Sequence, residues 1–252
     1  MKFGYTINNK LMMNSNGKLI GVDPYNPLNL PQGTIRVRTN DGQPPVNGHY
    51  NRATLVEGTN DVYDVYNGSS DEFIFTLASA TNVIDVLGVN GEGIFRMEST
   101  FRACTALSSM PSFDTSKVFS MNGTFQDCSS LLSAPFLDTS NVLSMSETFM
   151  NCTSLTSVPL YDTSNVTDIV GMMHAFANCS SLTSVPLFDT RNVINMDYMF
   201  FRCVNVQSGA LALYQQASSQ TNVTSHYGTF RDCGINTQTG SAELAQIPSD
   251  WK

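Results

Sequence analysis

The chain has 252 residues, of which 41% are hydrophobic and only 13% are charged, and its formal net charge is −8. This hydrophobic content argues against a disordered chain, and the negative charge without any Lys/Arg cluster excludes nucleic acid as a partner. No apolar run reaches the roughly 18 residues of a membrane-spanning helix, so we expect no membrane insertion.

Residues 1–70 carry no repeat, and we expect an N-terminal arm followed by a β-rich attachment module. The segments GTIRVRT, RATLVEG and DVYDVY have the composition of strands and are separated by Gly/Pro/Asn turns. The first residues lack the unbroken apolar stretch of about 7–15 residues of a secretory signal, so export by such a signal is not expected. Residues 71–96, which include TNVIDVLGVNGEG, resemble a degenerate repeat unit and are interpreted as an N-terminal cap.

Residues 97–233 repeat a unit of 24 residues in which a Phe precedes every Cys by three positions. A period in this range is typical of leucine-rich-repeat solenoids, whose coils cannot bury their apolar faces alone and therefore stack. Equivalent apolar residues then lie over one another and form a buried structural ladder along the stack. The ladder consists of Phe101, Phe125, Phe149, Phe176, Phe200, Phe230, Cys104, Cys128, Cys152, Cys179, Cys203 and Cys233.

Within each unit, the spacing Met-x-x-x-Phe-x-x-Cys predicts a short helical turn, and Val- and Thr-rich pieces such as SVP predict short strands. The fold class is therefore an α/β solenoid, a leucine-rich-repeat-type stack of 24-residue coils behind the β-rich module. After Cys203 the repeat weakens, and GALALYQQASSQ predicts a short helix packed over the stack. Residues 234–252, with AELAQIPSDWK, are interpreted as the C-terminal cap, because terminal repeats are atypical.

The repeat block resembles the BspA-like leucine-rich repeats of bacterial surface proteins. The resemblance rests on stretches such as MNGTFQDCSSLLSAPFLDTSNV and MSETFMNCTSLTSVPLYDTSNV, which match the M-F-C-L-P-D-T-S-N-V skeleton of that family. It implies a protein for adhesion or host interaction, and it brings no catalytic residues.

A second resemblance covers nearly the whole chain. LPQGTIRVRTNDGQPP, NVIDVLGVNGEG and GSAELAQIPSDWK are similar to segments of proteins from phages of gut bacteria, in which the module lies on the virion surface or is encoded near host-recognition genes. This resemblance implies a virion surface location, with synthesis in the cytoplasm of the bacterial host and release by lysis. The alternative location is the bacterial cell surface.

The six Cys and the four Asp of the repeat each allow two interpretations. The Cys spacings are unlike the close pairs of zinc sites, and although adjacent coils bring Cα atoms within disulfide reach, an inward thiol packs as a small hydrophobe, so a reduced ladder is favoured. Asp114, Asp138, Asp162 and Asp189 form a row that either binds Ca²⁺ or shapes turns through bonds to nearby backbone N–H groups. One acid per coil favours the turns.

No catalytic or metal centre is indicated. The three histidines, His49, His174 and His226, show no ligand spacing, and no nucleophile, phosphate-loop or dinucleotide motif is present. A glycosidase requires two carboxylates across a cleft, and nothing selects the pair Glu92 and Glu98. We predict no enzyme activity, no metal and no cofactor.

The positions around each Met-x-x-x-Phe vary between units, so they are candidates for a binding surface. The richest stretch in aromatic residues and Arg, which are common in binding hot spots, surrounds Phe200. An alternative is that Met199 and Phe201 only cover the neighbouring coil. The predicted binding residues are Met173, His174, Tyr198, Met199, Phe201 and Arg202.

These observations predict a non-enzymatic virion surface protein, a fibre or decoration protein that adheres to host cells. Residues 1–70 would attach to virion proteins, with a homotrimer as one candidate state, and the repeat face would bind a host-cell glycan or surface protein. Two alternatives stay open. One is a cellular surface adhesin of a gut bacterium, and the other is an accessory module that targets a carbohydrate substrate.

Overall fold

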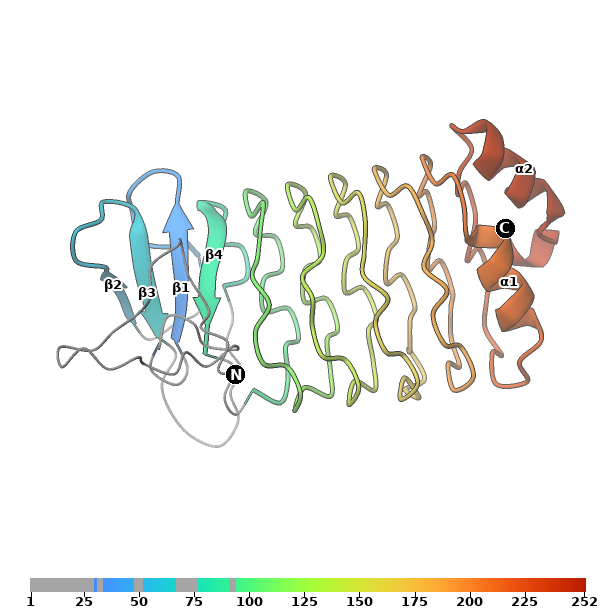
Figure 1. The fold of residues 1–252 in the computed structure, drawn as a ribbon, viewed down its shortest axis with the longest axis horizontal. Helices are drawn as coiled ribbons and strands as arrows, with labels where there is room; N and C mark the ends of the chain where they lie inside the picture. Colours follow the sequence, from blue (N-terminus) through green and yellow to red (C-terminus); the bar gives the residue numbers. More distant parts are fainter. Residues whose placement is uncertain (1–29, 31–33, 48–51, 67–76, 91–93) are drawn as a thin grey trace, which may run out of the picture.

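The structure is a computed structural model that describes residues 30, 34–47, 52–66, 77–90 and 94–252. Most of the predicted N-terminal arm, residues 1–29, lies outside the described residues, as do His49, Glu92 and parts of the predicted cap 71–96. The described chain is elongated, with a small sheet at one end, a row of coils in the middle and two helices at the other end (Figure 1).

The sheet lies next to the first coil and is built from segments rich in Val, Thr and Tyr, which favour strands. Its strands are β1 (Thr34–Thr39), β2 (Arg52–Leu55), β3 (Val62–Tyr66) and β4 (Val83–Val89). They lie in the order β2-β3-β1-β4, and all neighbours pair antiparallel. Arg36 faces Asp64 across the β1–β3 pair and donates to both carboxylate oxygens at 2.6 and 2.8 Å, which supports this register.

Strand β4, in the segment expected to form a degenerate coil, joins the sheet to the coils. One edge pairs antiparallel with β1. At the other edge, the N–H of Ser108 donates to the carbonyl of Ile84 at 2.8 Å, and Asp85 forms a parallel bridge with Ser109. Sheet and coils therefore share one continuous hydrophobic core.

Each repeat unit forms one coil that lies beside the next (Figure 1). We number the coils 1 to 6 by their phenylalanines, which are fully buried and stack with nearly parallel rings. The ring centroids are 5.2–5.6 Å apart from coil 1 to coil 5 and 6.1 Å apart between coils 5 and 6. The phenylalanines of coils 1 to 6 are, in order, Phe101, Phe125, Phe149, Phe176, Phe200 and Phe230.

The helical turn predicted at Met-x-x-x-Phe-x-x-Cys is wrong. In all six coils the residues two before and two after the Phe have left-handed φ angles, for example Glu147 (57°) and Asn151 (63°) around Phe149. A left-handed residue interrupts an α-helix. The segment between Met and Cys, which we call the turn segment, is instead a series of tight turns.

The left-handed residues let alternate backbone N–H groups point in different directions. In coil 2, the N–H of Phe125 donates to Thr148 in the next coil at 2.8 Å, whereas the N–H of Gln126 donates to Gly123 in its own coil. In an α-helix every interior N–H is used within the helix, and none would remain for the neighbouring coil. The need to bond coil to coil therefore overrides the helical spacing of the side chains.

The predicted coil strands shrink to isolated parallel bridges, such as Ser133 with Ser157 and Ser184 with Ser208. The α/β assignment is therefore wrong for the coils themselves, which contain neither helices nor extended strands in the part of the chain that the structure describes. Hydrogen bonds between coils hold the stack without long ladders, and in coils 1 to 4 the chain turns at the Asp-Thr pair.

Two helices cover the end of the stack. Helix α1 (Ala210–Ser218) lies in the segment where a helix was predicted, and α2 (Gln238–Gln246) is followed by the short 3₁₀ helix η1 (Ser249–Trp251). The Glu243 carboxylate of α2 accepts from the N–H groups of Gly209 and Leu211 at the start of α1. The carbonyl of Trp251 accepts from the N–H of Phe230 at 2.9 Å. The backbone edge of the last coil is thus hydrogen-bonded to the C-terminal residues instead of open to solvent.

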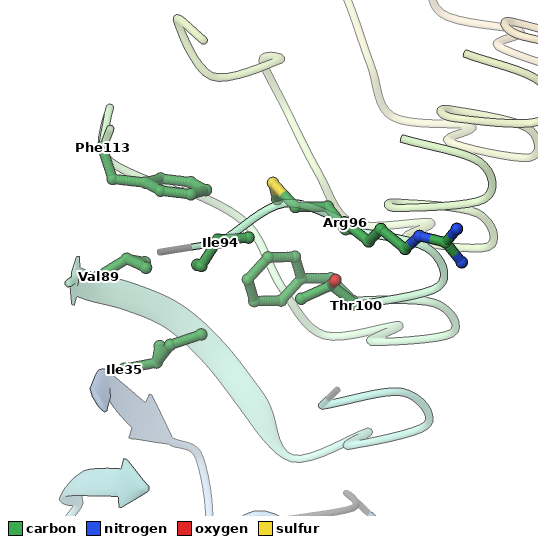
Figure 2. Close-up of a pocket in the computed structure, with 8 residues that line it drawn as sticks. Ile35, Val89, Ile94, Arg96, Thr100 and Phe113 are labelled. Atoms are coloured by element: carbon green, nitrogen blue, oxygen red, sulfur yellow. The ribbon is translucent and has the colours of Figure 1, made fainter. Parts of the chain in front are cut away.

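A small gap lies where the sheet meets coil 1. Figure 2 shows Ile35 and Val89 of the sheet facing Ile94 and Phe113 of the coil side, around a cavity of about 10 Å³. This volume is at the lower limit for a single water molecule, and the lining is mainly apolar. The gap is a packing defect and offers no ligand site.

Candidate binding surface

The cysteine thiols are free and buried, and four of them hold adjacent coils together. The Sγ of Cys128 donates to the carbonyl of Phe101 at 3.0 Å, and Cys152, Cys179 and Cys203 repeat this bond to the preceding coil at 3.1 Å. Burial raises the pKa of the Cys104 thiol to about 12. These thiols are therefore structural hydrogen-bond donors and not nucleophiles.

The four Asp of the repeat shape turns. In each, Oδ1 accepts from the backbone N–H two residues later at 2.9–3.0 Å, as the turn interpretation requires. A hydrogen bond from the Ser164 hydroxyl lowers the pKa of Asp162. Among the described residues no group of three or more His, Cys, Asp or Glu is arranged to hold a metal ion.

The remaining candidates for chemistry have structural neighbours. Glu98 accepts from the hydroxyl of Ser120 at 2.7 Å. The rings of His174 and His226 stack on Tyr198 and Trp251 at 5.0 and 4.1 Å. Glu98, His174 and His226 therefore support the surface, and none of these three contacts joins an acid to a base.

Among the predicted binding residues, Met199 is not on the surface. It is fully buried, because the residue directly before each Phe points into the core, where the other coils have Thr or Ala. Met173 is half-buried. The prediction that Met199 contacts a ligand is therefore wrong, because its side chain lies in the core.

The other four predicted residues meet on the turn segments of coils 4 and 5, together with two residues of coil 6 that the sequence interpretation missed. Tyr198 contacts Phe201 and Tyr227 edge-on at 5.5 and 5.4 Å. The guanidinium groups of Arg202 and Arg231 lie 4.9 and 6.0 Å from the centroid of the Phe201 ring. We call this surface the aromatic–arginine patch, and its members are His174, Tyr198, Phe201, Arg202, Tyr227 and Arg231.

The Tyr198 ring is held in place from both sides. His174 stacks on one side of it, and Gly228 of coil 6 leaves room for it, since a Cβ at Gly228 would lie 2.9 Å from the ring. Asp197 accepts from the N–H of Tyr227 at 2.6 Å and fixes the backbone next to the patch. Tyr198 is therefore a support, and Tyr227, which is 57% exposed, is the ring available to a ligand.

The same positions in the first coils carry different chemistry. Where coils 5 and 6 have Tyr198 and Tyr227, coil 2 has Gly123 and Asn122, and coil 3 has Glu147 and Ser146. The patch is thus a local feature of coils 4 to 6. A partly exposed ring beside two guanidinium groups provides cation–π contacts and forked hydrogen-bond donors, which suit recognition of a polar partner by a surface.

Comparisons with known proteins address the family of the chain. The family model described as "Mycoplasma protein of unknown function, DUF285" matches residues 69–173, 95–213 and 132–239, which together span more than half of the chain. No curated protein matches the chain. The family match covers the repeat block and supports its resemblance to BspA-like leucine-rich repeats, while the resemblance to phage proteins stays a prediction.

One solved structure that matches part of the chain is the crystal structure of a leucine-rich repeat protein from Eubacterium ventriosum. The two chains share 16% sequence identity with a TM-score of 0.36, and the match covers 66% of this chain. The matched part is 46% of the length of the Eubacterium protein.

None of the helices in the described part of the chain has the length and apolar character of a membrane span.

Proposed function

The chain belongs to the family described as "Mycoplasma protein of unknown function, DUF285", and from this premise we propose that it is a non-enzymatic surface adhesion protein built on a leucine-rich-repeat-type solenoid. The stack presents its turn segments to a glycan or protein on another cell, and the aromatic–arginine patch makes the specific contacts. The repeat block within the family match supports the adhesion class, because the BspA-like repeats that it resembles are known from surface proteins.

One observation carries this proposal. Aromatic and Arg side chains gather on the turn segments of coils 4 to 6. There, two guanidinium groups lie 4.9 and 6.0 Å from the centroid of the Phe201 ring, and Tyr227 is exposed. The equivalent positions in coils 2 and 3 hold Gly, Asn, Ser and Glu. Packing of the core does not require this difference, because the Phe and Cys ladder is the same in all six coils.

The patch is tested by loss of adhesion. Fluorescently labelled protein is bound to a panel of intact gut-bacterial strains and to glycan and surface-protein arrays, and binding is measured by flow cytometry and fluorescence. We expect the double variant Tyr227→Ala, Arg231→Ala to bind at least about tenfold more weakly, as expected for hot-spot residues. Arg102→Ala is the matched control, since Arg102 is exposed at the position of coil 1 that corresponds to Arg231.

If the double variant binds as well as the parent protein while Arg102→Ala also binds normally, the patch is not the adhesive surface. Thermal unfolding of each variant, followed by circular dichroism, separates loss of binding from loss of fold. The exposed positions of Tyr227 and Arg231 lead us to expect unchanged melting temperatures.

For its location, we propose the virion surface, with attachment to virion proteins through residues 1–70 and the bacterial cell surface as the alternative. Mass spectrometry and immunogold labelling of purified particles test this. Stoichiometric copies on the particle support a fibre or decoration protein, whereas the chain in the bacterial envelope alone supports a cellular adhesin. Co-purification with a carbohydrate-active enzyme would instead support the accessory module.

A further inference from the structure

A second surface, outside the turn segments that carry the aromatic–arginine patch, follows the Pro-x-x-Asp-Thr segments of coils 2 to 4. The residue after the Pro is a large apolar side chain that is strongly exposed: Phe136 is 74% exposed, Leu160 is 67% exposed and Leu187 is 52% exposed. Soluble proteins seldom expose contiguous apolar side chains in this way unless they bind a partner.

The acidic residues of the turns lie on the same surface. Exposed and buried residues alternate along each segment, with Phe136 and Asp138 exposed and Leu137 and Thr139 buried, as in any extended chain. Asp162 is likewise exposed two residues after Leu160. We call this surface the apolar–acidic face, and its members are Phe136, Leu160, Leu187, Asp138 and Asp162.

Hydrogen bonds keep this face in register from coil to coil. The buried hydroxyl of Thr139 donates to the carbonyl of Asp162 at 2.9 Å, and Thr163 donates in the same way to Asp189 in coil 4. The stacked phenylalanines of coils 2 to 4 give a coil spacing of 5.2–5.6 Å. The face therefore presents one apolar side chain at this interval, with one carboxylate beside it in coils 2 and 3.

The charge of the face is negative and ends at coil 4. Asp138 and Asp162 use one carboxylate oxygen for the turn and have no Lys or Arg partner among the residues that the structure describes. In coil 4, Arg191 pairs with Asp189 at 2.6 Å. A shallow hollow of about 360 Å³ lies there, lined by Leu187, Asp189, Arg191, Gln216 and Gln220.

The apolar row is too small to hold two copies of this chain together. A stable interface takes about 20–30 residues from each partner, and the row supplies three large side chains. A ligand that matches the row must instead repeat its apolar groups at the coil spacing and carry positive charge beside them.

An α-helix meets both requirements, because its pitch is about 5.4 Å and residues three or four apart lie on one side. We propose that the apolar–acidic face binds a cationic amphipathic helix of a partner protein, which lies along the stack axis. Its apolar stripe covers Phe136, Leu160 and Leu187, and Lys or Arg in the adjacent stripe face Asp138 and Asp162. This is a recurring mode of helix recognition on a hydrophobic surface.

The probe for this proposal is a fluorescein-labelled helical peptide of about 20 residues, made of Leu in one stripe, Lys in the adjacent stripes and Ala elsewhere, a length at which such helices form in water. Binding to the full chain is followed by fluorescence anisotropy at low and high salt. A peptide with Glu in place of Lys has the same apolar stripe and serves as the matched control.

We expect the Lys peptide to bind and the Glu peptide to bind at least about tenfold more weakly, with a salt-dependent affinity for the Lys peptide. Phe136→Ser with Leu160→Ser should abolish binding. Asp138→Asn with Asp162→Asn should weaken it and remove most of its salt dependence, because Asn keeps the turn acceptor and loses the charge. The patch variant Tyr227→Ala should bind the peptide normally, so failure of this proposal is separate from failure of the adhesion proposal.

Three results would overturn the inference. Equal binding of the Lys and Glu peptides would show that the carboxylates do not select the ligand. If neither peptide binds, the face does not bind an amphipathic helix. Light scattering that shows a dimer of the parent and a monomer of Phe136→Ser, Leu160→Ser would assign the face to a second copy. Binding of a soluble neutral polysaccharide that this double variant loses would assign the face to a glycan.

Discussion

Phe149 tests the stack most directly, because it lies at the centre of the ladder. It is fully buried, and its ring lies 5.2 Å from Phe125, 5.6 Å from Phe176 and 6.1 Å from Tyr161. Truncation of a buried Phe to Ala costs about 3–5 kcal/mol. Each aromatic contact adds about 0.5–1.5 kcal/mol beyond area burial, so we expect Phe149→Ala to lower the free energy of unfolding by about 5 kcal/mol, at the upper end of that range.

The assay is urea unfolding followed by circular dichroism, which reports on the whole stack, and by the fluorescence of Trp251, the chain's one tryptophan, which covers its end. Because repeat arrays lose cooperativity, the two probes should separate if only the central coils melt. Tyr227→Ala is the control for an exposed ring. If Phe149→Ala fails to fold, Phe149→Leu should still fold with a smaller loss; if Phe149→Ala unfolds at the same urea concentration as the parent, the ladder does not carry the stability of the stack.

Four further outcomes follow from the structure. All six Cys should resist iodoacetamide at pH 8 in the folded protein and react after urea unfolding, which mass spectrometry would show; labelling of the native chain would contradict the buried thiol ladder. Gly209→Ala should cost about 3 kcal/mol, since φ at Gly209 is 96° and a Cβ would collide with the carbonyl of Val185; an unchanged melting temperature would be evidence against this geometry. Glu243→Ala should cost about 1–2 kcal/mol by removing the acceptors at the start of α1, measured by thermal unfolding with Gln246→Ala as the exposed control. The pKa of Asp162 is lowered in the folded protein, so its contribution to stability is present above the unfolded pKa of about 3.9 and is lost as the pH falls through the folded pKa. Asp162→Asn should therefore reduce the fall in melting temperature with decreasing pH, measured by thermal unfolding at a series of pH values.

The positions of the core residues were accessible from the sequence because they depend on register alone. Phe and Cys recur at one interval, and coils that stack in parallel must place them over one another. The strands near residues 34–39 and 62–66 and the helix near 210–218 were likewise visible, since Val/Thr-rich segments and an Ala/Leu/Gln segment have clear preferences.

The backbone of the turn segments was not accessible in this way. Ten of its twelve left-handed positions carry a residue other than Gly. Asn or Asp at four of them, such as Asn151, is a partial signal for this conformation, whereas Glu147 and Tyr198 give none. Bonds between coils determine this conformation. The inward direction of Met199 follows from the same backbone, and it was missed because an α-helical turn places that residue differently.

The members of the patch in coil 6 were missed for another reason. Tyr227 and Arg231 stand in the same positions relative to Phe230 as Asp197 and Phe201 relative to Phe200. Phe230 and Cys233 had placed coil 6 in register with the other coils, but only the stretch around Phe200 was compared for aromatic and Arg content. Comparing the residues around Phe230 in the same way would have found Tyr227 and Arg231.

The bonding scheme of the coils also makes the length of the molecule adjustable. Every inner coil offers alternate N–H groups on one side and carbonyls on the other, so each junction resembles the next. Inserting or deleting one 24-residue unit, for example between Val118 and Val142, would leave both ends intact and change the length by about one coil spacing, 5.2–5.4 Å. Duplication of one unit in the gene would therefore lengthen the stack, and deletion of one unit would shorten it. Either change would alter the distance between the last coil and the sheet without any change in the sheet or in the terminal helices.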